Sequence, residues 1–379
     1  MKKIIFMLVL LLIPLNYVKA DTLSLKAKSA ILIDQNTGEI LYKLNENERR
    51  PMASMTKIMS LLLIMEKIDD GSLKYEDEVV VSDVASSMGG SQIFLQPGDK
   101  YSVKELLKAV AMSSANDAIV ALAEKTYGSK EAFIEKMNSR ASELGLKNTN
   151  FVNVHGLDDE NHYSSAYDMA IMARELLKHE DIINFTSVYE EYLKRPDGSQ
   201  IWLVNTNKLV RFYDGVDGLK TGYTSSAGYC LTSTAMKNNL RLIGVVMGED
   251  TIESRSQDTV KLLNYGFNTY KVNLIKAKNE VVGRIRVEGG KFDYADVILK
   301  EDATELLKTS DKASKYNYEM TVDVINAPVK KGSVIGKIKI LNENNKLINE
   351  VDITIKEDVP KANLLDLFAR NLKMVLSFN

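Results

Sequence analysis

A serine and a lysine three positions apart form the first group of residues able to do chemistry. Ser54 and Lys57 belong to Ser-Met-Thr-Lys, which opens the apolar run 58–65. Good helix formers without an internal glycine or proline predict a buried helix from about Ser54. Residues three apart share a helix face, so the hydroxyl and the amine could act as nucleophile and base. Taken alone, the pattern is more often a capping serine followed by a surface lysine.

Two further motifs change that reading. Ser114-Ala115-Asn116 lies between two predicted helices, and Lys220-Thr221-Gly222 leads into a predicted strand pair. Each is weak alone, since Lys-Thr-Gly is more often a simple turn. In this order, however, Ser-x-x-Lys, Ser-x-Asn and Lys-Thr-Gly are the signatures of penicillin-binding proteins and class A β-lactamases. The three motifs together predict acyl transfer through a serine.

The composition limits the class of protein that could carry out this chemistry. The chain has 379 residues, of which 45% are hydrophobic and 26% charged, as in a globular protein with room for two domains. A net charge of −2 gives no reason to expect a nucleic-acid partner. Cys230 is the only cysteine, which excludes an intramolecular disulfide.

The N-terminus has the pattern of a secretory signal. Lys2 and Lys3 precede the apolar stretch 4–13, and Val18-Lys19-Ala20 resembles a cleavage site. An uncleaved anchor is the alternative, but ten apolar residues are too few to span a bilayer comfortably. Residues 1–20 are therefore predicted to be a signal peptide, and the mature chain is predicted to be exported.

The elements that must position the motifs can be outlined from periodicity. Apolar runs at 30–33 and 39–42 around a glycine-containing turn predict a hairpin. Helices are predicted at 102–112, 116–125, 129–144, 165–178 and 254–270. Strands are predicted near Val216 and at 228–234 and 240–247. This order predicts an α+β catalytic domain, 21–274, with an antiparallel sheet flanked by helices.

The last hundred residues differ from the rest in their pattern of apolar and polar residues. Period-two alternation with intervening turns predicts a small all-β domain at 275–358. Residues 359–379 read as an amphipathic helix suited to a membrane surface. Docking of this helix on its own β-domain is the alternative.

Over about 24–358 the sequence resembles the serine-type D-alanyl-D-alanine carboxypeptidases, which are low-molecular-mass penicillin-binding proteins. Matching stretches besides the three motifs are 95–99 (Leu-Gln-Pro-Gly-Asp), 112–118, 154–158 and 261–267. Ser-Ala-Asn instead of Ser-Asp-Asn is usual in that branch. The resemblance implies removal of the terminal D-alanine from peptidoglycan stem peptides outside the cytoplasmic membrane. It also implies covalent inhibition by β-lactams, with neither cofactor nor metal.

The roles follow from what acyl transfer requires. Ser54 would attack and become acylated, Lys57 would take its proton, and Ser114 would relay a proton to the leaving amine. The predicted catalytic residues are Ser54, Lys57, Ser114, Asn116 and Lys220. The predicted substrate-binding residues are Lys220, Thr221, Gly222, Tyr223, Thr224 and Arg255, of which Arg255 rests on the resemblance alone. Backbone N–H groups of Ser54 and Tyr223 would form the oxyanion hole.

Other functions have to be weighed against this one. A class A β-lactamase needs a water-activating glutamate between the second and third motifs, and Glu180-Asp181-Ile182-Ile183-Asn184 is the one Glu-x-x-x-Asn there. A β-rich second domain and a C-terminal anchor, however, are not typical of that class. No His-Glu-x-x-His is present, which disfavours a zinc peptidase. A D,D-endopeptidase or transpeptidase shares the same acyl-enzyme and stays open. A silent wall-binding protein would not require the intact Ser54, Lys57 and Lys220.

Overall fold

The computed structural model describes residues 23–313, 315–366 and 368. The predicted signal segment 1–20 lies outside the described residues, as does most of the predicted C-terminal helix 359–379. Within the described ranges, no helix is both long enough and apolar enough to cross a membrane.

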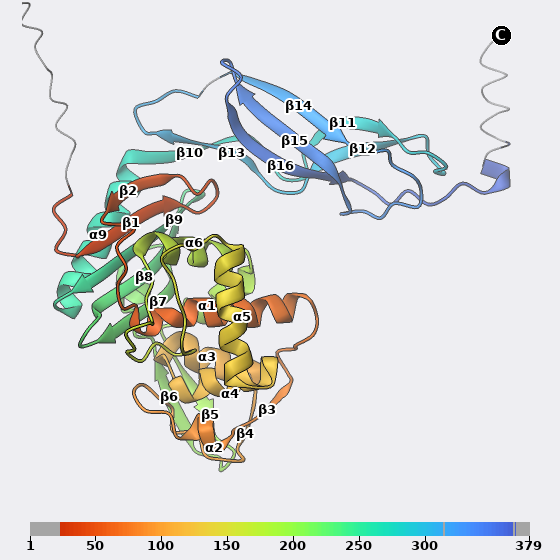
Figure 1. Ribbon diagram of the computed structural model, residues 1–379. Helices are drawn as coiled ribbons and strands as arrows, with labels where there is room; N and C mark the ends of the chain where they lie inside the picture. Colours follow the sequence, from red (N-terminus) through yellow and green to blue (C-terminus); the bar gives the residue numbers. More distant parts are fainter. Residues whose placement is uncertain (1–22, 314, 367, 369–379) are drawn as a thin grey trace, which may run out of the picture.

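An antiparallel five-stranded sheet, in the order β2-β1-β9-β8-β7, is the framework of the first region (Figure 1). Its strands are β1 (Ser29–Asp34), β2 (Ile40–Leu44), β7 (Val216–Thr224), β8 (Gly228–Lys237) and β9 (Leu240–Glu249). Successive side chains of a strand point to opposite faces. In β1, Ile31 and Ile33 accordingly join one core cluster, while Leu32 joins another. Both faces of the sheet must therefore be covered.

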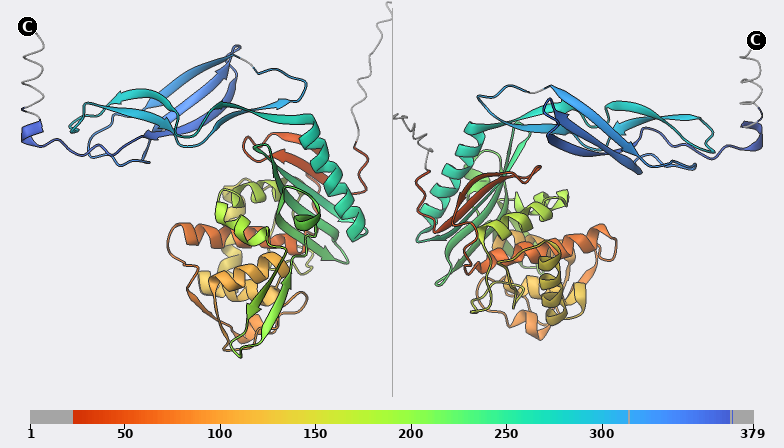
Figure 2. Two further views of the ribbon diagram at one scale, coloured as in Figure 1. Left: turned by 180° about the vertical axis from the view of Figure 1, so that it is seen from behind. Right: turned by 45° about the horizontal axis from the view of Figure 1, so that its top comes forward.

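Helices provide this cover on the two faces. On one face α9 (Ile252–Thr269) contributes Leu262 and Leu263 to the smaller core. The other face carries α1 (Lys57–Asp69), α3 (Val103–Ser113), α4 (Asn116–Tyr127), α5 (Lys130–Glu143) and α6 (Ala166–Leu176). Figure 2 shows α9 and this helical group on opposite sides of the sheet. The predicted α+β class is confirmed, and so is the capping box at Ser102, whose hydroxyl accepts from the Glu105 N–H.

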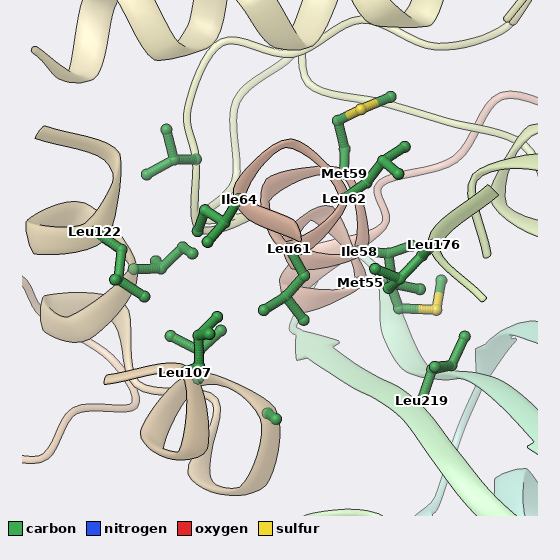
Figure 3. Packing of buried hydrophobic residues seen from close by; sticks show 14 of the residues in the cluster. Met55, Ile58, Met59, Leu61, Leu62, Ile64, Leu107, Leu122, Leu176 and Leu219 are labelled. Atoms are coloured by element: carbon green, nitrogen blue, oxygen red, sulfur yellow. The ribbon is translucent and has the colours of Figure 1, made fainter. Parts of the chain in front are cut away.

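Helix α1 is the buried central helix that the apolar run predicts. Every residue from Lys57 to Met65 is buried. Figure 3 shows its side chains surrounded by Leu107 of α3, Leu122 of α4 and Leu219 of β7. Full burial of one such side chain contributes about 1.5–3 kcal/mol. The helix starts later than predicted, because residues 53–56 form a tighter 3₁₀ turn, η1 (Ala53–Thr56), and α1 begins at Lys57.

Shorter elements complete the first region. They are β3 (Glu78–Val80), α2 (Asp83–Ser86), β4 (Lys100–Ser102), η2 (Glu180–Ile182), α7 (Ile183–Thr186), β5 (Glu190–Lys194), β6 (Gln200–Val204) and α8 (Leu209–Phe212). Strands β5 and β6 form an antiparallel hairpin that sequence patterning did not predict. The hairpin lies at the end of this region that is remote from the all-β residues 270–355 (Figure 1).

The second region is all β. Its strands are β10 (Tyr270–Lys276), β11 (Val281–Arg286), β12 (Tyr294–Leu299), β13 (Ala303–Lys308), β14 (Tyr316–Val322), β15 (Val334–Asn342) and β16 (Leu347–Ile355). A sheet in the order β11-β12-β16-β15-β14 has its own core, which includes Val297, Ile340 and Ile353. Strand β10 pairs with β13 and follows α9 directly, so strand structure begins at Tyr270.

Candidate active site

The turn that carries Ser54 is fixed by a relay of hydrogen bonds. The Val152 N–H donates to His162 Nδ1 at 3.1 Å, so the proton of this imidazole lies on Nε2. His162 Nε2 then donates to Thr56 Oγ1 at 2.7 Å, and this hydroxyl donates to the Ala53 carbonyl at 2.7 Å. Burial lowers the pKa of His162 to about 4, which keeps the ring neutral. His162 was not predicted as a positioning residue, because only the fold brings it to the turn.

Gly156 packs against the same turn. A Cβ at this position would lie 1.9 Å from the Ala53 carbonyl oxygen, and the backbone has φ +95°. A side chain would therefore collide with backbone in a conformation that L residues rarely adopt. The glycine lets the 154–158 stretch approach η1 closely.

This contact gives a prediction with a matched control. Gly156→Ala should lower the free energy of unfolding by about 3 kcal/mol or more, because it adds a backbone collision to an unfavourable φ. Gly145→Ala has φ +71° with nothing within 4 Å, so it should cost only about 1–2 kcal/mol. Urea unfolding would measure both losses. Equal losses would show that the contact with Ala53 is easily relieved.

Lys57 lies at the centre of the site. Its side chain is fully buried, and Nζ lies 3.0 Å from Ser54 Oγ, 2.6 Å from Asn116 Oδ1 and 2.8 Å from the His155 carbonyl. Burial, followed by the charge of Lys220, lowers the pKa of Lys57 well below its usual 10.5. A neutral amine has two N–H donors and one lone pair. Since the two carbonyl oxygens can only accept, they use both donors, and the lone pair is left to face the Ser54 hydroxyl.

The second motif stands at the junction of α3 and α4. Ser114 ends α3 in the left-handed conformation, φ +61° and ψ +28°. Its Oγ is buried and has no protein partner. Asn116 donates through Nδ2 to the Gly89 carbonyl at 2.7 Å, which leaves Oδ1 directed at Lys57. The Ser114 hydroxyl is thus available to a substrate, whereas the Asn116 amide is held.

Asp117 supports this arrangement from inside the protein. Its buried carboxylate accepts from the Ile93 N–H at 3.1 Å and the Leu95 N–H at 3.1 Å. The same loop is tied to α4 by the Asn116 N–H, which donates to the Ser91 carbonyl at 2.7 Å. No local pattern singled out Asp117, because its partners lie more than twenty residues earlier in the chain.

The third motif lies on the edge strand β7, beside η1. Gly222 is required by this approach, because a Cβ would lie 2.7 Å from the Met52 carbonyl oxygen. Lys220 is buried, and burial together with the nearby Arg255 charge lowers its pKa to about 7. The Thr221 hydroxyl donates to Thr206 Oγ1 at 2.7 Å.

The remaining predicted residues have different surroundings. Arg255 of α9 is only 5% exposed, its Nε has no protein partner, and burial lowers its pKa. Tyr223 is 55% exposed and stacks on Tyr229 with ring centroids 4.2 Å apart. Thr224 donates its hydroxyl to Asp158 Oδ1 at 2.7 Å, so this hydroxyl is already engaged.

A cavity of about 510 Å³ joins the three motifs. It is lined by Ser54, Ser91, Ser114, Val204, Asn205, Thr206, Lys208, Thr221, Gly222, Tyr223, Tyr229, Ile252 and Arg255. Lys57, Asn116 and Lys220 lie behind this lining. A second cavity, of about 500 Å³, surrounds Phe292 and Tyr294 in the second region and touches no motif residue. In the part of the chain that the structure describes, no group of three histidine, cysteine or carboxylate side chains could hold a metal ion.

Comparison with known proteins identifies the family of the chain. Residues 16–251 match the family model described as D-alanyl-D-alanine carboxypeptidase, and residues 270–361 match that of the penicillin-binding protein 5 C-terminal domain. The carboxypeptidase DacF of Bacillus subtilis is 46% identical over 93% of this chain and 91% of its own length. DacA of Escherichia coli is 34% identical over 92% of this chain and 87% of its own. The crystal structure of Haemophilus influenzae penicillin-binding protein 5 has a TM-score of 0.69 at 33% identity, covering 90% of this chain and 99% of that one.

The fold and the ordered motifs define a serine-type peptidase of the penicillin-binding class. Within that class, the chain belongs to the D-alanyl-D-alanine carboxypeptidase family. The predicted family, fold class and enzyme class are thereby confirmed.

Proposed function

We propose that this chain removes the terminal D-alanine from peptidoglycan stem pentapeptides through an acyl-enzyme on Ser54. The observation that carries the proposal is the position of Lys57 Nζ, 3.0 Å from Ser54 Oγ, with two carbonyl oxygens using its other hydrogen-bonding capacity. Complete burial beside Lys220 lowers the pKa of Lys57 well below 10.5, which favours a neutral general base over a structural cation in this arrangement.

In the first step Ser54 Oγ attacks the carbonyl of the penultimate D-alanine while its proton passes to Lys57. The tetrahedral oxyanion would be held by the N–H groups of Ser54 and Tyr223. The C–N bond then breaks, and the Ser114 hydroxyl gives its proton to the leaving amine while the proton on Lys57 replaces it on Ser114. D-alanine departs, and Lys57 is neutral again. In the second step water attacks the ester carbonyl and loses its proton to the neutral Lys57. As the ester C–O bond breaks, Lys57 returns this proton to Ser54 Oγ, which regenerates the serine.

The free carboxylate of the substrate selects the C-terminal residue. The unpaired Arg255 guanidinium and the Thr221 hydroxyl line the same cavity as Ser54 and Ser114, with Lys220 buried behind them. An anion there satisfies the Arg255 guanidinium, which otherwise lacks a partner, and it is attracted by the Lys220 charge. The same groups would receive the carboxylate of a β-lactam, whose strained amide would acylate Ser54.

The experiment that tests the function measures two products. A soluble diacyl-L-Lys-D-Ala-D-Ala tripeptide should release free D-alanine, whereas the same tripeptide with a C-terminal amide should react at least about tenfold more slowly because it lacks the carboxylate. Benzylpenicillin should leave a lasting one-to-one adduct in the intact mass. Rapid consumption of benzylpenicillin without an adduct would support a β-lactamase. Transfer to an added amine in place of hydrolysis would support a transpeptidase.

The pKa shifts predict how activity depends on pH. Lys57 must be neutral to act, so acylation should rise with pH through its lowered pKa. Lys220 must be charged to attract the carboxylate, and its pKa of about 7 means that this charge is lost as the pH rises above about 7. The expected result is a bell-shaped kcat/KM with KM increasing on the alkaline side. Lys220→Arg keeps its charge and should abolish that increase, and an unchanged increase in this variant would assign it to another group.

We also propose the predicted division of the mature chain, with a catalytic domain at 21–274, a β-rich domain at 275–358 and an amphipathic anchor at 359–379 on the outer face of the cytoplasmic membrane. The described start of the anchor supports this, since Leu364, Leu365 and Phe368 are each more than two-thirds exposed. Residues 21–379 should sediment with anionic vesicles and residues 21–360 should not. Equal sedimentation of the two would contradict the anchor.

A further inference from the structure

The β5–β6 hairpin presents two large aromatic side chains to solvent at directly paired positions. Tyr192 and Trp202 are cross-strand partners and are 62% and 58% exposed. The neighbouring positions, Leu193 and Leu203, point the other way and are buried in the main core. The hairpin is thus anchored by its inner face, and its outer face carries two aromatic side chains at paired positions, each more than half exposed.

This outer face continues into the candidate active site. Val204 lies two residues beyond Trp202 on the same face of β6, and it lines the cavity that contains Ser54. Asn205 and Thr206, which follow it, line the cavity as well. A ligand that leaves the cavity past Val204 therefore meets Trp202 and Tyr192 next.

The composition of the face indicates what it binds. Its other positions are Glu190, Lys194 and Gln200, so two opposite charges and an amide flank the aromatic pair. An apolar ring surface with polar groups at its margin suits pyranose rings, whose C–H faces stack on aromatics while their hydroxyl and amide groups accept and donate hydrogen bonds. Glu190 is also paired with Arg211 at 4.0 Å, and Lys194 is the one cation among the outer positions, which is too few for a strongly anionic polymer. With six outer positions it is much smaller than the 20–30 residues per side of a stable protein interface.

We propose that this outer face, with Tyr192 and Trp202 at its centre, binds the glycan strand to which the stem peptide is attached. The inference rests on the proposed function, since a stem peptide with its end at Ser54 brings its sugar to the outside of the cavity. The hairpin would then give the enzyme a preference for peptides that are still attached to glycan, at no cost to chemistry on short peptides.

Trp202 is the only tryptophan in the chain, so its fluorescence reports on this face without a label. Glycan strands stripped of their stem peptides by an amidase should shift or quench its emission saturably, in the wild type and in Ser54→Ala alike. Tyr192→Ala should weaken this binding about tenfold, within the range for a central interface aromatic. Tyr294→Ala removes an aromatic that is 59% exposed in the second region, and it should bind as the wild type does.

The second part of the test compares enzyme turnover on two substrates. Trp202→Ala should lower kcat/KM about tenfold on soluble glycan strands that carry pentapeptides, and change it less than twofold on the diacyl tripeptide. Equal losses on both substrates would overturn the proposal, because the hairpin would then only support the cavity. A fluorescence change that follows protein concentration, or that occurs with anionic vesicles but not with glycan, would assign the face to a second copy or to lipid and also overturn it.

The two proposals fail in different ways. A wild-type chain that binds stripped strands but releases no D-alanine from the tripeptide would sink the proposed function and leave the glycan site standing. Normal tripeptide turnover with no fluorescence response to glycan would do the reverse.

Discussion

Ser54→Ala should give a folded protein that releases no measurable D-alanine and forms no benzylpenicillin adduct. The substitution removes the only described hydroxyl in contact with Lys57 Nζ. Deletion of a serine nucleophile elsewhere costs on the order of 10⁶ in kcat, so a loss of at least about 10⁴-fold is expected here. Since Ser54 is only half-buried and a hydroxyl is exchanged for a hydrogen, the free energy of unfolding should change by less than about 1 kcal/mol.

Intact-mass time courses with benzylpenicillin would measure this result directly. Ser256→Ala is a suitable control, because Ser256 is a half-buried serine beside Arg255 whose hydroxyl donates to the Ile252 carbonyl of its own helix. It should acylate at the wild-type rate. An adduct that persists in Ser54→Ala would place the nucleophile elsewhere, with Ser114 as the first position to examine.

Lys57→Met should have the second largest effect. It keeps an unbranched side chain in the buried site but removes the base, so acylation should slow by about 10²–10⁴-fold. The thioether cannot donate to the Asn116 and His155 oxygens, which costs about 1–3 kcal/mol for each group left unsatisfied. Relief from burying an amine offsets part of that cost. Stability should therefore fall by far less than the activity does.

Stopped-flow measurement of the acylation rate across a range of pH would distinguish a general base from a lysine with only a structural role. The wild-type rate should rise with pH through the Lys57 pKa, and the residual rate of Lys57→Met should lack that rise. Lys67→Met changes a partly exposed lysine of the same helix that pairs with Asp70 and lies over the Tyr127 ring, remote from Ser54, and it should keep both rate and profile. If Lys57→Met retained the pH dependence of the wild type, the base would have to be another group.

The chemistry was visible in the sequence because it depends on short motifs. Ser54 and Lys57 are three residues apart, so local helix geometry alone brings them together. The capping box at Ser102 is local for the same reason. What the motifs could not supply is the support between them. His162 reaches Thr56 across 106 residues, and Asp117 holds the N–H groups on both sides of Phe94.

The β5–β6 hairpin was missed for a physical reason. A half-buried strand is recognised by alternation of apolar and polar residues. In β6, Ile201, Trp202, Leu203 and Val204 are apolar on both faces, so the alternation disappears although Trp202 is exposed. The exposed Trp202 is thus the residue that conceals this strand in the sequence.

Because of the position of β1, the catalytic sheet cannot be completed until a segment far along the chain is present. Ser29–Asp34 pairs on one side with the next strand of the chain, but on the other with Leu240–Glu249, about 200 residues later. Sheets closed by such distant segments fold slowly, because the entropy of closing the loop is lost before the pairing is gained. A chain crossing a membrane N-terminus first could not complete this sheet until the segment containing β9 had followed. For a chain exported as proposed, this topology would delay closure of the catalytic sheet until the segment containing β9 had crossed.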